Sequence, residues 1–185
     1  MLRDLLKEGA KPETVILVFF LGNDFRDNYM DWVRRSEVGW MGSYVVSQIV
    51  GYRKVPTEQF EMAFRKTGEA LDELKALCAE QARRLLVVGL PGKAEVLQSV
   101  KDHPRWPEGL ERTVFEWEGE HSQFSFDGPN ERLGEMLHVR GIEYVSLLAS
   151  FRAHAREGLY GDQDPHWTPR GEELAAEIVA DYLRR

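Results

Sequence analysis

Three short runs of apolar residues alternate along the chain with segments in which apolar positions recur every three or four residues. The runs cover residues 15–21, 85–90 and 142–148. The first is β-branched and aromatic, is apolar on both faces, and is bounded by Pro12 and Gly22. This pattern is typical of a central strand in a parallel sheet. The runs therefore predict three strands.

The segments between the runs have the period of amphipathic helices. Apolar residues at helical spacing over residues 60–78 form one stripe, which predicts a long helix. A shorter helix is predicted over residues 130–140, where Gly141 ends it. The last helix is expected to begin after Thr168, a good N-cap, with Pro169 at its first helical position.

This alternation predicts the α/β class, with a mostly parallel sheet layered between helices and right-handed crossovers. The chain has 185 residues, 43% of them hydrophobic and 30% charged. That size suits one domain with a substantial core, so a single domain is expected over residues 1–185. Ligands of such sheets bind at the carboxyl ends of the strands. Residues 22–28 lie at such an end.

Charge and composition narrow the choice of partners. The chain has 24 basic and 31 acidic residues, a formal charge of -7, and its basic residues are scattered. This argues against nucleic acid as a partner. The single cysteine, Cys78, excludes an intrachain disulfide, and no apolar run approaches ~20 residues, so no transmembrane segment is expected. The first nine residues resemble the second half of an amphipathic helix, which leaves the native N-terminus and the compartment open.

A catalytic base and its orienting carboxylate are expected in residues 162–171, which read DQDPHWTPRG. Asp164 lies two residues before His166, Asp162 lies four before it, and a capped helix follows. A carboxylate beside an imidazole fixes its tautomer and stabilises its protonated form. The alternative is that these side chains lie on a surface loop and have no catalytic role. The other histidines have no acidic partner at motif spacing and are expected to be structural or solvated: His103, His121, His138 and His154.

A second polar cluster, Gly22-Asn23-Asp24, directly follows the first predicted strand. The Asn23 amide there can donate a hydrogen bond to a developing oxyanion, a contribution of about 3 kcal/mol in other enzymes. Gly22 is expected to allow either a close backbone approach or a positive φ. The alternative is a simple turn, which all three residue types favour.

Together the two clusters resemble conserved blocks of the SGNH hydrolases, also called GDSL-type esterases and lipases. Residues 21–28, LGNDFRDN, are similar to the third block, in which the Asn is an oxyanion donor. Residues 164–171, DPHWTPRG, are similar to the last block, in which Asp and His belong to a catalytic triad. The resemblance covers residues 10–185 in order and spacing.

The resemblance implies a flavodoxin-like, three-layer α/β/α fold and a serine hydrolase that cleaves carboxylic ester or O-acetyl bonds, including those of carbohydrates. It implies His166 as general base and acid, Asp164 as its orienting carboxylate and Asn23 as oxyanion donor. Gly22 and Asp24 would support the oxyanion site. It implies no cofactor and no metal.

Three departures from the family pattern stand out. The commonest spacing places the acid three residues before the His, where this chain has Gln163. The two-residue spacing followed by Trp is more similar to the subgroup of polysaccharide O-acetyl transferases and esterases. Leu21 replaces the usual first glycine of the third block. The nucleophilic serine of the family precedes the Asn block, whereas every serine here follows Asn23, and Ser43 is the least unsuitable substitute.

The sequence is therefore expected to lack the nucleophile block and the N-terminal strands that accompany it. Without them, the strand at residues 15–21 would present an apolar edge that seeks another chain, so a homo-oligomer through that edge is one expectation. The chain alone is expected to be weakly active or inactive.

Two other functions remain open from the sequence. One is a non-catalytic binding module that keeps the crevice of the family. The other is a hydrolase that depends on a divalent metal, because Asp162, Asp164 and His166 alternate along an extended segment and Asp24 or Asp27 could complete the set. Such oxygen-rich ligands suit Mg²⁺ or Mn²⁺.

Overall fold

The computed structural model describes residues 4, 8–9, 12–22, 24–27, 51–81, 83–98, 125–162 and 166–185. Its strands are β1 (Thr14–Phe20), β2 (Arg84–Leu90) and β3 (Glu143–Ser146). Its α-helices are α2 (Asp24–Asp27), α4 (Glu58–Glu80), α5 (Lys93–Leu97), α7 (Gly128–Val139), α8 (Leu148–Ala153) and α9 (Pro169–Leu183), and a 3-10 turn spans Ala155–Glu157.

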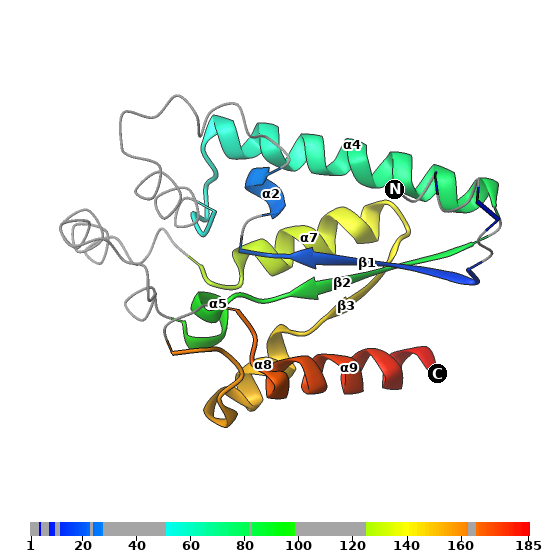
Figure 1. Ribbon diagram of the computed structural model, residues 1–185. Helices are drawn as coiled ribbons and strands as arrows, with labels where there is room; N and C mark the ends of the chain where they lie inside the picture. Colours follow the sequence, from blue (N-terminus) through cyan, green and yellow to red (C-terminus); the bar gives the residue numbers. More distant parts are fainter. Residues whose placement is uncertain are drawn as a thin grey trace.

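The described strands form one parallel sheet in the order β1-β2-β3 (Figure 1). β1 pairs with β2 from Thr14↔Arg84 to Phe20↔Leu90, and β2 pairs with β3 from Leu86↔Glu143 to Gly89↔Ser146. The three predicted strands and the α/β class are therefore confirmed. Because all three strands run the same way, their carboxyl ends meet at one edge of the sheet.

The core lies on both faces of β2, whose inner residues Leu86, Val87 and Val88 are at most 2% exposed. On one face Val87 packs with Leu71 of α4 and Leu133 of α7. On the other, Leu86 and Val88 pack with residues of α8 and α9 (Figure 1). Complete burial of an aliphatic side chain contributes about 1.5–3 kcal/mol, so the central strand is the main apolar support of both helix layers.

The long helices follow the predicted stripes. α4 begins after Thr57, whose hydroxyl accepts a hydrogen bond from the Phe60 N–H at 3.4 Å. α9 begins after Thr168, as predicted, and the Thr168 hydroxyl accepts from the Gly171 N–H at 3.4 Å. Cys78 is buried on α4. No helix of the described residues is both long enough and apolar enough to span a membrane.

The third strand is shorter than predicted, because the apolar run at residues 142–148 contains a helix start. The Leu147 N–H donates to the Gly89 carbonyl at 3.2 Å, and the Ser146 hydroxyl accepts from the Leu148 N–H at 3.3 Å. Leu148 then begins α8 and is buried like a strand residue. The helices α5 and α8 are too short to show a period in the sequence.

Within the described sheet β1 is an edge strand, which agrees with the expected apolar edge and differs from the central position that its two-sided apolar pattern alone indicates. Ile16 and Val18 share the face of Leu86 and Val88, their partners in register. They are nevertheless 41% and 53% exposed. The apolar pattern on both faces of β1 therefore includes one face that no described element covers.

Two positions that pair across the ladder test this difference. Leu86→Ala should lower the free energy of unfolding by about 2–5 kcal/mol, because it opens a cavity in a fully buried site. Ile16→Ala, on the same face and in register with Leu86, should cost clearly less because Ile16 is 41% exposed. Urea unfolding of both variants measures the contrast. Equal losses would mean that Ile16 is covered in solution.

Candidate functional site

The turns that follow β1 and β2 meet at the carboxyl edge of the sheet. The Leu21 N–H donates to the Leu90 carbonyl at 2.9 Å, so the ladder continues past both strands. The Phe20 ring lies against both turns, since a Cβ atom built on Gly22 or Gly92 would come within 2.8 or 3.4 Å of its Cζ atom. The two glycines let the ring lie between the turns.

Gly22 and Asp24 have structural roles in the turn after β1. Of the two expectations for Gly22, the close approach is confirmed, whereas its φ is not among the positive values of the described glycines. Asp24 accepts a hydrogen bond from the Phe20 N–H through its Oδ2 atom at 2.7 Å and begins α2. The Asp24 carboxylate thus closes the turn. Asn23, the predicted oxyanion donor, lies outside the described residues.

The loop that carries His166 is attached to the carboxyl end of β2. The Tyr160 hydroxyl donates to the Pro91 carbonyl at 2.7 Å, and the Gly161 N–H donates to the His166 carbonyl at 3.1 Å. Tyr160 and Trp167 form an antiparallel bridge, which closes the loop at its base. Trp167 packs on the buried Phe151 ring with centroids 5.0 Å apart.

His166 itself is exposed at this edge, next to the anchored Trp167. The backbone around this exposed residue is therefore fixed. Asp162 is also exposed, and Asp164 lies outside the described residues. The structure thus brings the loop of His166 and the turn of Gly22 and Asp24 to the same edge, where both adjoin the turn between β2 and α5.

The remaining described histidines have other contacts, and His154 lies 4.0 Å from the Glu157 Oε1 atom through its Nε2 atom. His154 is the C-cap of α8, and its Nδ1 atom lies 2.8 Å from the Ser150 carbonyl oxygen. His138 is exposed in the last turn of α7. Their contacts are those of structural or solvated residues. His103, His121 and the substitute nucleophile Ser43 lie outside the described residues.

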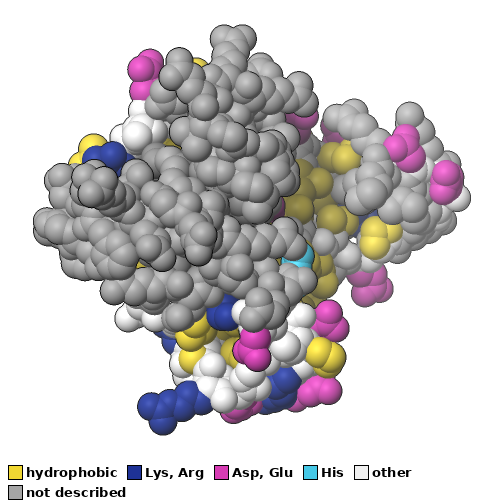
Figure 2. Space-filling view, turned by 60° about the vertical axis from the view of Figure 1, so that its left-hand side comes forward, with side chains coloured by type: hydrophobic (Ala, Val, Ile, Leu, Met, Phe, Trp, Pro, Cys, Tyr) yellow, Lys and Arg dark blue, Asp and Glu magenta, His cyan; other side chains and the backbone are white. Residues whose placement is uncertain are grey.

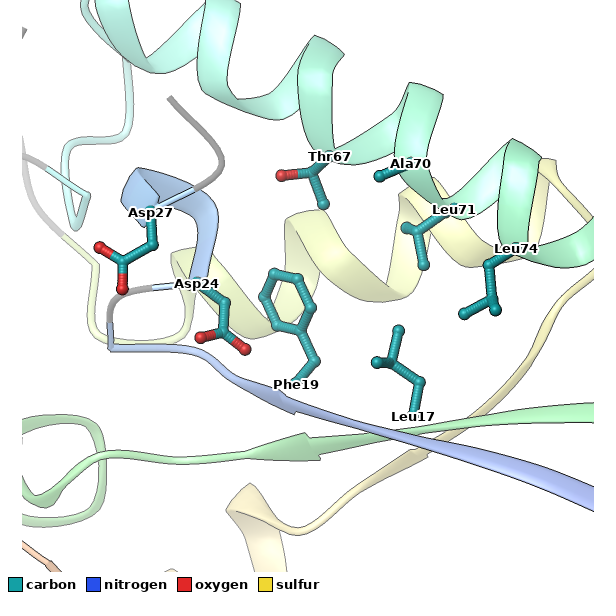
Figure 3. A pocket seen from close by; sticks show the side chains of 8 residues that line it. All are labelled: Leu17, Phe19, Asp24, Asp27, Thr67, Ala70, Leu71 and Leu74. Atoms are coloured by element: carbon teal, nitrogen blue, oxygen red, sulfur yellow. The ribbon is translucent and has the colours of Figure 1, made fainter. Parts of the chain in front are cut away.

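A pocket of about 300 Å³ lies between β1, α2 and α4 (Figure 3). Asp24 and Asp27 lie at the end nearest α2, whereas Leu17, Leu71 and Leu74 form apolar walls further along β1. The pocket therefore combines an acidic end with an apolar groove. Within the described ranges, no three or more His, Cys, Asp or Glu side chains gather in a way that could hold a metal ion.

The described part of the surface carries no marked basic stripe in the view that brings the carboxyl edge forward. Figure 2 shows Lys and Arg side chains scattered among acidic ones, and hydrophobic side chains gathered in a hollow. The exposed large hydrophobic residues of the described chain include Ile16 and Val18 on β1. On the described part of the surface in this view, the apolar hollow is the more distinctive feature.

Sequence reasoning missed Glu95, a carboxylic acid that is completely buried beside the β2–α5 turn. Burial raises its pKa to about 7, although Tyr52, the Gly92 backbone and Arg152 favour its ionised form. Neither carboxylate oxygen has a hydrogen bond of ordinary length and angle within the described residues. Tyr52 and the Gly92 backbone therefore lower the pKa of Glu95 by less than the loss of hydration on burial raises it.

A sequence signal for Glu95 does exist. Gly92 is the N-cap of α5, which makes Glu95 its third helical residue. An acid at this position commonly folds back toward the N-cap. A Cβ atom on Gly92 would lie 2.6 Å from the Glu95 Oε2 atom, so the side chain does fold back in this way. The signal was hidden because α5 is only five residues long.

Comparison of the chain with models of protein families, with curated proteins and with solved structures finds no match.

Gly171, five residues after His166, is tightly enclosed, and this generates a first prediction for the site. A Cβ atom there would lie 2.5 Å from the Leu159 carbonyl oxygen and 3.2 Å from the Trp167 Cβ atom. Gly171→Ala should therefore displace the His166 loop and cost about 1–3 kcal/mol in urea unfolding. The neighbouring exposed Glu172→Ala is the matched control and should change stability by at most about 0.5 kcal/mol. A harmless Gly171→Ala would contradict the packing described.

The buried acid predicts an unusual dependence of stability on pH. Unfolding returns Glu95 from a pKa of about 7 to its ordinary value of 4.5. As pH rises, Glu95 therefore loses its proton in the unfolded chain before it does so in the folded chain. The free energy of unfolding falls between pH 4.5 and about 7 and is constant above that range. Relative to Glu95→Gln, the wild type should lose on the order of 3 kcal/mol across this window.

Urea unfolding at a series of pH values measures this difference. Subtracting the Glu95→Gln curve from the wild-type curve removes the contributions of other carboxylates, such as Glu143, whose pKa is lowered chiefly by its hydrogen bond with Arg84. Glu135→Gln, exposed on α7, is the control and should give a flat difference. A flat difference for Glu95→Gln as well would show that Glu95 is solvated.

Proposed function

We propose that this chain is the C-terminal part of an SGNH-type serine hydrolase with a flavodoxin-like, three-layer fold, acting on carboxylic ester or O-acetyl bonds. One observation carries the proposal. The residues just before the two motifs, Phe20 and Tyr160, contact the same β2–α5 turn at Gly92 and Pro91, although the motifs are far apart in sequence. Helices on both faces of a parallel sheet are consistent with it.

In the complete enzyme a serine attacks the acyl carbon of the ester. His166 takes the serine proton and returns it to the leaving alcohol, and Asp164 orients the imidazole. Asn23 donates to the oxyanion as the carbonyl becomes tetrahedral. Gly22 and Asp24 support this donor by fixing the turn, since Asp24 binds the Phe20 N–H. The exposure of His166 leaves its ring accessible to a substrate.

The nucleophile would be supplied by a segment that pairs with the edge of β1 that no described strand occupies. That edge is flanked on one face by the groove between β1 and α4 and on the other by the exposed Ile16 and Val18. An added strand has side chains on both faces, so it would cover both apolar surfaces at once. A second copy of the chain is the other occupant considered, and would make the protein a homo-oligomer.

The product of the native gene tests the proposal. Its intact mass and N-terminal sequence should reveal a longer chain with a Gly-Asp-Ser-like segment, and a serine-directed phosphonate should label that serine. His166→Ala should then lower kcat/KM for p-nitrophenyl acetate by on the order of 10³-fold or more, because it removes the general base. Asp164→Asn should also lower it strongly. His138→Ala, in the last turn of α7 before the amino end of β3, is the matched control and should leave the rate unchanged.

Other outcomes would favour the other functions. Loss of activity on chelation, with no phosphonate label, would replace the serine mechanism by a metal-dependent one that uses Asp162, Asp164 and His166. Stoichiometric binding of an ester without turnover would favour a binding module. A product that begins at Met1, with no labelled serine and no second chain at the β1 edge, would overturn the proposal.

A further inference from the structure

Glu95 joins three parts of the molecule that approach the carboxyl end of β2. Its main-chain carbonyl accepts hydrogen bonds from Arg152 of α8, through Nε at 3.0 Å and Nη2 at 2.8 Å. Its side chain faces Tyr52, in the segment before α4, and folds over Gly92. The neighbouring Val96 packs in the same cluster as Tyr160. A change in the protonation or position of Glu95 would therefore alter contacts with α8, with the Tyr52 segment and with the cluster that contains Tyr160 of the His166 loop.

The charged and titratable groups around Glu95 do not neutralise it. Arg152 is directed to the carbonyl rather than to the carboxylate and is paired with Asp127 through its Nη1 atom. Tyr52 and Tyr160 are phenols whose pKa values are raised, chiefly by burial and further by Glu95. Lys93, on the same helix, donates from its Nζ atom to the Gly161 carbonyl at 3.3 Å. A negative Glu95 would thus lack a dedicated counter-ion among the described groups.

The element that carries Glu95 is suited to movement. α5 has five residues and ends at Gln98, whose φ of 53° and ψ of 36° lie in the left-handed region. A non-glycine residue in this region is strained, because its Cβ atom approaches the following carbonyl oxygen. A helix this short is also marginal without its tertiary contacts. Release of α5 would therefore relieve local strain while it lets the Glu95 side chain reach water.

We propose that Glu95 is a proton-controlled latch for the loop that carries His166. With its proton on, Glu95 stays buried, and the β2–α5 turn holds the loop through the bonds from Tyr160 to Pro91 and from Lys93 to Gly161. When the proton passes to solvent, the carboxylate moves into water, α5 loosens, and the loop loses these anchors. The proposal does not depend on hydrolase activity.

Amide hydrogen exchange on the full chain tests the latch. The reporters are the Gly161 and Thr168 N–H groups, which bond the His166 and Leu159 carbonyls. After correction for intrinsic exchange, their protection should fall about tenfold per pH unit as the opening becomes easier, and should level above the Glu95 pKa of about 7. The same decline should persist in His166→Ala, which lacks the imidazole.

The control variants separate a latch from general unfolding. In Glu95→Gln the decline should vanish, whereas Glu135→Gln, exposed on α7, should behave as the wild type. The reporters should exchange with little dependence on urea, unlike core amides such as Val87 and Val88, because a latch opens locally. A decline that survives Glu95→Gln, or reporters with the protection and urea dependence of the core, would overturn the proposal.

Discussion

The fold depends above all on the burial of β2 on both faces. A strand in this position must be apolar at every inner residue, and Leu86, Val87 and Val88 meet that requirement. Parallel pairing on either side then directs the carboxyl ends of all three described strands to one edge. This strand therefore fixes the positions of the turns at that edge. It also fixes the loop of His166, which is bonded to Pro91 through Tyr160. The candidate site is thus a consequence of the core.

The sequence predicted those elements whose pattern is long enough to repeat. α4 and α9 show several turns of one apolar stripe, and the N-cap Thr168 also indicated the start of α9. α5 and α8 span five and six residues, too few for a period to emerge. The end of β3 was missed because a leucine at position 148 can be buried in the core either as a strand residue or as the first residue of a helix. In the structure it begins α8. The general α/β class followed from the alternation, whereas the edge position of β1 was expected only from the family resemblance and not from its apolar pattern.

The candidate site divides in the same way between local and tertiary information. Local motifs identified the His166 loop and the turn around Gly22 and Asp24, which the structure brings to one edge. Their roles as base and oxyanion support stay predictions. Glu95 escaped notice because its importance comes from burial, which depends on packing by Tyr52 and Tyr160 from distant parts of the chain. A hydrophobicity pattern treats any glutamate as surface.

Burial of an acid next to the candidate site is difficult to explain as a means of stabilisation. A glutamine would occupy a similar volume without the cost of holding a proton or burying a charge. A capping role at the N-terminus of α5 would be served equally well by an exposed carboxylate, which keeps its water. What the buried acid adds is a dependence of local structure on proton concentration, which runs from its ordinary pKa of 4.5 up to its raised pKa of about 7. The contacts from Tyr160 to Pro91 and from Lys93 to Gly161 transmit that dependence to the loop of His166.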